Sequence, residues 1–218
     1  RARYPEHKPT PVSGAQTQEI YTMLGSAVAS EHGTRRLIGV QAQGMTACPC
    51  AQELVAARAT ERLAADGFTD DEIERVFEHV PVATHNQRGL GTLYIGCPEA
   101  CAESIEATKL LHIVEESMSS EIYELMKRSD EVEVVEKAHR RPRFVEDCVR
   151  EMIRMAVEEF RGFGDDAFVF ARQENLETIH QHNVVAERYG LIAELDRELR
   201  SDEPVASHLT MRDWLHHR

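Results

Sequence analysis

The segment from residue 143 to residue 164, RFVEDCVREMIRMAVEEFRGFG, constrains the fold most strongly. Its apolar residues recur every three or four positions, which is typical of an α-helix that buries one face. Gly162 and Gly164 end this predicted helix. The apolar face comprises Val145, Cys148, Val149, Met152, Ala156 and Phe160.

Two other segments alternate in the manner of strands. RRLIGVQAQGMTA predicts a strand over about 36–46, and GLGTLYIG predicts another over 89–96. Further strands are predicted from DDAFVFARQ and from HNVVAERYGLIAELDREL, with a strand that finishes as a helix as the alternative for the latter.

The remaining patterns are helical. Helices are predicted over 51–67, over 69–80 with Thr69 as the cap, over about 103–127, and briefly before Ala29. The resulting order is that of an α+β fold with helices on one face of an antiparallel sheet.

The charge balance limits the possible partners. The formal net charge of −13 argues against nucleic-acid binding, because the mean field repels a phosphate backbone. Because the sequence contains neither a membrane span nor a signal peptide, a cytoplasmic location is expected. The odd count of five cysteines favours reduced thiols over a disulfide framework.

Three clusters carry groups that suit metal chemistry. In GMTACPCAQE, Cys48 and Cys50 flank a proline, which allows one thiol to face a site while the other packs in the core. THNQRG places His85 among polar side chains. ENLETIHQHN pairs Glu177 with His180 on a helix, or His180 with His182 on a strand. Each cluster has an ordinary structural explanation, but together they suit Zn²⁺, Fe²⁺ or Mn²⁺.

A fourth cluster is basic. The dense run near EKAHRRPRFVED is either a solvated loop or a cradle for a polyphosphate in an otherwise acidic chain. Glu146 follows this run and is equally explained as a carboxylate that complements the helix dipole. The basic run includes Lys137, His139, Arg140, Arg141 and Arg143.

Five motifs in this order resemble the type IB GTP cyclohydrolases, most closely the archaeal form of the methanopterin pathway. They are GMTACPCAQE, HNQRG, SSEIYELMKRSDE, RPRFVEDCVREM and QENLETIHQHNVVAE, and the resemblance runs from about Tyr4 to Glu194. It implies the tunnelling fold, in which modules assemble into a barrel with active sites near subunit boundaries.

Composition and the resemblance together imply a domain organisation. The Pro-rich, polar start predicts an extended lead-in over 1–35, which the resemblance makes the remnant of an N-terminal module, and a catalytic domain is expected at 36–198. By composition, residues 199–218 are expected to be an exposed tail. The family's assembly implies a homodimer or a homotetramer.

The matching motifs imply roles for individual residues. The residues expected around the metal are Cys48, His85, Glu131, Glu177 and His180. Those expected to take part in catalysis are Cys48, His85, His180 and His182, whereas Cys50 is expected to be structural. Glu146 is expected to accept hydrogen bonds from the guanine edge. The cations expected to bind substrate are Arg88, Lys127, Arg128, Arg140 and Arg141.

The implied reaction is hydrolytic opening of the imidazole ring of GTP by a metal-activated water, with loss of formate and closure to a dihydroneopterin phosphate. The archaeal form implies Fe²⁺ and a cyclic phosphate product, with Zn²⁺ and Mn²⁺ as alternatives. Two other functions fit the same residues. One is a nitrile reductase of the same fold, which uses a nucleophilic cysteine, and the other is a non-catalytic purine- or pterin-binding fragment.

Overall fold

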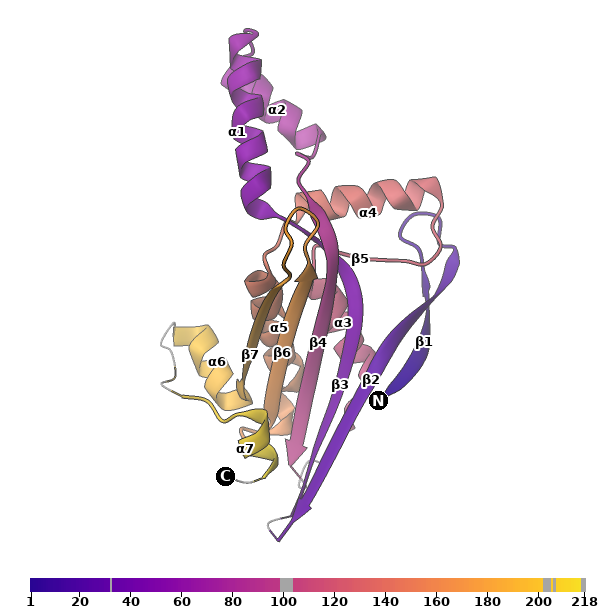
Figure 1. Cartoon of the computed structure of the whole chain (residues 1–218), viewed down its shortest axis with the longest axis vertical. Helices are drawn as coiled ribbons and strands as arrows, with labels where there is room; N and C mark the ends of the chain where they lie inside the picture. The colour runs from indigo at the N-terminus through magenta and orange to yellow at the C-terminus, as the bar shows by residue number, and fades with distance from the viewer. Residues whose placement is uncertain (32, 99–103, 202–204, 206, 217–218) are drawn as a thin grey trace.

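The computed structural model describes residues 1–31, 33–98, 104–201, 205 and 207–216. Its main element is a long, twisted antiparallel sheet in the order β1-β2-β3-β4-β6-β7, with the short β5 paired to β3 (Figure 1). The strands are β1 (Ala2–Pro9), β2 (Gln16–Ser30), β3 (Gly33–Ala47), β4 (Asn86–Pro98), β5 (Ser120–Glu121), β6 (Phe168–Leu176) and β7 (Val184–Leu191).

Helices α3 and α5 lie behind the sheet, which confirms the predicted α+β class (Figure 1). The helices are α1 (Pro49–Ala65), α2 (Asp70–His79), α3 (Ala107–Ser117), α4 (Arg128–Arg140), α5 (Val145–Phe160), α6 (Ile192–Ser201) and α7 (Met211–Leu215), and a 3₁₀ turn, η1 (Arg161–Phe163), follows α5. Among these helices, none combines the length and the hydropathy needed to cross a bilayer, as far as the described residues go.

The main core lies between these two helices and the sheet. All six residues of the apolar face predicted for residues 143–164 are buried on α5. They pack with α3 against sheet residues such as Val40, Leu93 and Val169. This packing fixes the N-terminal end of α5 against the sheet, and with it Glu146 in the first turn of the helix.

The opposite face of the sheet is covered at its lower end by the C-terminal segment. Trp214 of α7 is 1% exposed and stacks on Phe168 with ring centroids 5.6 Å apart. Its Nε1–H donates to the backbone oxygen of Asp166 at 2.8 Å. The region expected to be an exposed tail therefore contributes a second small core.

The N-terminal region differs most from expectation. Residues expected to be a lead-in pair as β1 and β2 of the same sheet, and the helix expected before Ala29 is part of β2. The helix predicted over 103–127 is α3, which ends at Ser117 and is followed by β5. The strand-then-helix alternative for the last predicted strand is correct, because β7 leads directly into α6.

Between β3 and β4 the chain forms a helical hairpin, α1 and α2, that projects from the end of the sheet (Figure 1). Both helices were predicted. Gly67 follows α1 with a φ of 94°, and Thr69 caps α2 in a reciprocal capping box with Glu72. Since the hairpin is an insertion between two paired strands, its two ends meet at the sheet.

Candidate active site

The pairing of β3 with β4 brings Cys48 and His85 together. Ala47 pairs with Asn86 in the last step of the ladder, so the next residues on each strand also face one another. The amide of Cys48 donates to the backbone oxygen of His85 at 3.1 Å, and the Thr84 hydroxyl donates to the oxygen of Cys48 at 2.9 Å. Two residues separated by the whole hairpin are therefore neighbours.

The loop between β6 and β7 adds three more polar groups at the same end of the sheet. Glu177, His180 and His182 lie in this loop, which is neither the helix nor the strand expected from their spacing. The rings of His180 and His182 stack at 5.3 Å, and those of His85 and His180 lie 6.3 Å apart, edge to face. The antiparallel order places the end of β6 beside the start of β4, which explains the convergence.

These side chains share one cavity of about 250 Å³. This cavity opens at the N-terminal end of α5, where Glu146 forms part of its wall. Glu146 also borders a neighbouring groove of about 380 Å³ that runs along α5, β7 and α6. The residues that line the smaller cavity are Cys48, His85, Gln87, Arg143, Phe144, Val145, Glu146, Asn175, Glu177, His180, His182 and Val184.

The donor set of this cavity fits a transition metal. One thiol, several imidazoles and a carboxylate are the ligands that Zn²⁺ and Fe²⁺ accept. As they stand, however, no three His, Cys, Asp or Glu side chains within the described ranges lie close enough to hold an ion. Of the possible donors, His180 and His182 are exposed on a loop, whereas Cys48 and His85 are half-buried at the ends of their strands.

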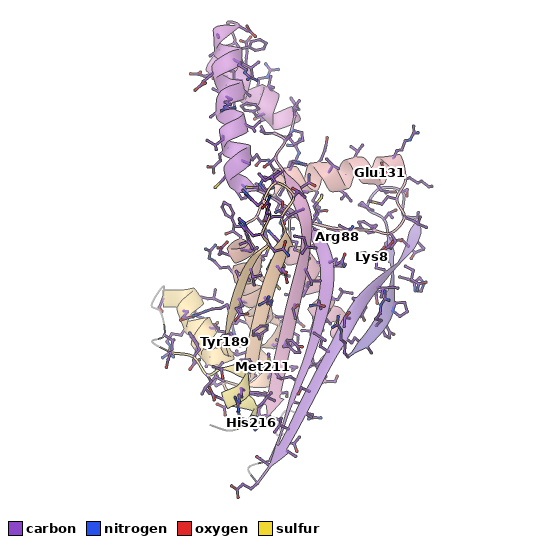
Figure 2. All side chains as sticks on the ribbon, in the orientation of Figure 1. Lys8, Arg88, Glu131, Tyr189, Met211 and His216 are labelled. Atoms are coloured by element: carbon purple, nitrogen blue, oxygen red, sulfur yellow. The ribbon has the colours of Figure 1, made fainter. Side chains whose placement is uncertain are left out.

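Glu131 does not belong to this group within a single chain. It is exposed in the first turns of α4 (Figure 2). Only the other end of α4 adjoins the site, where Nε2 of His139 lies 3.4 Å from the oxygen of Thr84. Glu131 precedes His139 by eight residues, or about 12 Å at roughly 1.5 Å per helical residue.

The five cations predicted to bind substrate also lie outside the cavity wall. Arg88 is exposed on β4, next to the buried Gln87, and the alternation of side chains along a strand directs the two to opposite faces. Arg140 donates to the backbone oxygens of α2, and Arg141 pairs with Glu116 at 3.2 Å. Lys127 and Arg128 begin α4 at its distant end.

The cation in the wall is instead Arg143, at the end of the basic run. Its Nη1 donates to the backbone oxygen of Ser117 at 2.7 Å. Burial, together with the neighbouring Arg141, lowers the pKa of this guanidinium. The density of the basic run indicated an anion site in general, but the sequence did not indicate which member of the run would face it.

Two buried amides were also missed. Gln87 is 5% exposed and Asn175 is 3% exposed, and both line the cavity. Gln87 lies within the polar HNQRG motif, which was the available signal. Cys50 corrects another expectation, because it is exposed at the start of α1 and cannot pack in the core. Cys97 corrects the expectation of reduced thiols, because it is buried and disulfide-bonded. Cys101, which follows Cys97 at C-x₃-C spacing, lies outside the described residues.

Comparison with known proteins identifies the family. The model of the type I GTP cyclohydrolase folE2 family matches residues 1–186. The chain belongs to this family. It is 42% identical over 202 residues to GTP cyclohydrolase MptA of Methanococcus aeolicus, covering 90% of this chain and 65% of the relative.

Two further relatives give the same picture. The identity is 41% to GTP cyclohydrolase MptA of Methanocaldococcus jannaschii, over 89% of this chain and 63% of the relative. It is 44% to GTP cyclohydrolase MptA 1 of Methanocella arvoryzae, over 93% of this chain and 64% of the relative. The chain thus spans just under two thirds of the length of the curated relatives it matches.

Proposed function

We propose that this chain is the catalytic part of a metal-dependent GTP cyclohydrolase that opens the guanine imidazole ring, releases formate and yields a dihydroneopterin phosphate, in cyclic form. The observation that carries the proposal is the convergence of Cys48, His85, Glu177 and His180 on one cavity in a member of this family. Such an activity supplies the pterin ring for methanopterin- or folate-type cofactors.

We assign Cys48, His85 and His180 as ligands of one Fe²⁺ ion, with Zn²⁺ or Mn²⁺ as alternatives. The bound ion would make hydroxide available near neutral pH. Glu177 remains a predicted ligand, although here its Oε2 faces Nδ1 of His85 at 3.9 Å. Glu131 can join such a site only from a neighbouring chain, which accords with assembly of two or four chains in the tunnelling fold.

The remaining residues of the wall bind substrate and move protons. The carboxylate of Glu146 can accept two hydrogen bonds, from N1–H and the exocyclic amine of guanine. Arg143 offers a positive charge in the same wall. His182 is exposed next to His180, where its ring nitrogens can pass protons between the site and solvent.

The two cysteines of the CPC motif provide the test. The protein is incubated with GTP and Fe²⁺ without oxygen, then oxidised and assayed for pterin fluorescence and for formate. Cys48→Ala is expected to abolish both signals. Cys50→Ala, the matched control, is expected to retain them and the wild-type stability, because Cys50 is exposed. Equal loss in both folded variants, or no product from the wild type, would contradict the proposal.

A further inference from the structure

The proton position on His85 follows from the groups around its ring. Two oxygen atoms face Nδ1, namely Oε1 of Gln87 at 3.0 Å and Oε2 of Glu177 at 3.9 Å. Oxygen atoms of an amide carbonyl and of a carboxylate accept hydrogen bonds. Nδ1 therefore carries the proton, and the lone pair of the neutral ring lies on Nε2.

The position of the Gln87 side chain is itself held by a buried partner. Its Nε2 donates to Oγ1 of Thr46 at 3.1 Å, and Thr46 is fully buried on β3. Gln87 and Thr46 are direct partners across the β3–β4 ladder, so the backbone register sets their separation. Because a hydroxyl both donates and accepts, the direction of the Gln87 amide follows from Glu177, whose carboxylate at Nδ1 can only accept and so favours a proton there and the Gln87 oxygen facing it.

We infer that Gln87 is a positioning residue that, with Thr46, holds His85 in the Nδ1–H tautomer and aims Nε2 at the ion. The inference rests on the proposed metal site, in which a neutral imidazole needs a free ring nitrogen. Partners of this kind fix the tautomer and ring orientation of ligating histidines, and their removal typically costs about 10–100-fold in metal affinity. Gln87 is thus assigned to act on the ion through His85.

Two substitutions at this position separate orientation from packing. Gln87→Met keeps the approximate shape but removes the acceptor for Nδ1–H. Gln87→Glu keeps an oxygen toward Nδ1 and offers the other to the Thr46 hydroxyl, so it should rescue the tautomer. A matched control lies on the opposite face of the same two strands, where Gln41 donates to Oγ1 of Thr92 at 3.0 Å. Gln41→Met removes an equivalent bond away from the site.

The first measurement uses metal-free protein labelled with ¹⁵N. Long-range ¹H–¹⁵N spectra at pH 8 distinguish the two histidine tautomers, and His85→Asn identifies the signals of His85. The wild type, Gln87→Glu and Gln41→Met should show the Nδ1–H form, whereas Gln87→Met should shift toward the Nε2–H form. An Nε2–H form in the wild type, or an unchanged tautomer in Gln87→Met, would overturn the inference whatever the activity with GTP.

The second measurement is titration with Co²⁺, followed by the thiolate-to-cobalt charge-transfer band. Gln87→Met should bind Co²⁺ about 10–100-fold more weakly than the wild type, while Gln87→Glu and Gln41→Met should match it. Should Gln87→Met fail to fold, Thr46→Val releases the Gln87 amide and should produce the same tautomer shift. Equal Co²⁺ affinity in the wild type and folded Gln87→Met would refute the inference, and no band in any form would refute the metal site as well.

Discussion

Replacement of Trp214 by alanine tests whether the C-terminal segment is part of the folded core. The side chain is 1% exposed, and besides Phe168 it contacts the guanidinium carbon of Arg35, 4.8 Å from the ring centroid. Nη1 of Arg35 also donates to the backbone oxygen of Trp214 at 2.6 Å. Truncation of a buried tryptophan to alanine costs about 3–5 kcal/mol, because both the transfer free energy and the packing are lost.

Several kcal/mol is a large share of a typical free energy of unfolding. For a chain of this length, about 3–5 kcal/mol corresponds to a fall in Tm of roughly 6–20 °C. Trp214→Phe keeps the stacked ring and loses the Nε1–H bond to Asp166, so its cost should be smaller, about 1–2 kcal/mol. The order of stability should be wild type, then Trp214→Phe, then Trp214→Ala.

The assay is urea unfolding followed by far-UV circular dichroism at one fixed protein concentration, because association changes the midpoint. Leu125→Ala is the control, since Leu125 is 74% exposed and its truncation should stay within about 0.5 kcal/mol of the wild type. Trp214 is the single tryptophan of the sequence, so its fluorescence reports undocking of the segment directly. If Trp214→Ala were as stable as Leu125→Ala, the packing described for α7 would be wrong.

Three further perturbations have defined outcomes. Burial raises the pKa of the Cys148 thiol from 9.0 to about 12, so thiol reagents at pH 8 should modify the exposed Cys50 first. The free energy of unfolding should fall above about pH 9, because there the thiol loses its proton only in the unfolded chain. Rapid labelling of Cys148 in the folded protein would contradict this. Gly96→Val should destabilise the protein and alter Trp214 fluorescence, because a Cβ there would lie 2.7 Å from the indole; an unchanged spectrum and midpoint would argue against that contact. Burial alone would raise the pKa of Asp130, but hydrogen bonds from the turn between β1 and β2 hold this pKa well below its ordinary value. The ionised carboxylate therefore stabilises the folded protein above about pH 3.8, and this stabilisation is lost as the pH falls. Asp130→Asn should therefore unfold at lower urea at pH 7 and show a weaker acid dependence, and wild-type behaviour would be evidence against that anchor.

The elements that could be predicted are those with strong local signals. The apolar stripe of α5, the cap at Thr69 and the alternation in β3 each specify one structure without help from distant residues. β1 gave a misleading signal because it contains Pro5 and Pro9, which suggest a loop but are tolerated in an edge strand. Its strand character comes from pairing with β2.

The basic run illustrates a different limit. Most of this run belongs to the end of α4. In this helix the buried apolar positions are Val134 and Ala138, and the buried Asp130 lies one turn before them. So few buried positions do not distinguish a helix from a charged loop. Where the cations point depends on how α4 packs, and that information is not local.

Several residues of the candidate site could be predicted, but their geometry could not. The residue types of Cys48, His85 and His180 indicated a metal site, and all three line one cavity. Whether Arg88 or Gln87 faces the cavity depends on the register of β4, since a shift of one residue exchanges the two faces of a strand. The register of β3 against β4 is set by tertiary pairing, so neither the exclusion of Arg88 nor the burial of Gln87 could be read from the sequence.

The most direct test of the central claim is X-ray absorption at the zinc edge of the protein loaded with one equivalent of Zn²⁺. The proposed site predicts one sulfur at about 2.3 Å together with nitrogen or oxygen neighbours at about 2.0–2.2 Å, with histidine scattering in the outer shell. Cys48→Ser should lose the sulfur shell, while Cys50→Ser should keep it. A spectrum without sulfur in the wild type, or a sulfur shell that survives Cys48→Ser, would show that Cys48 does not hold the metal.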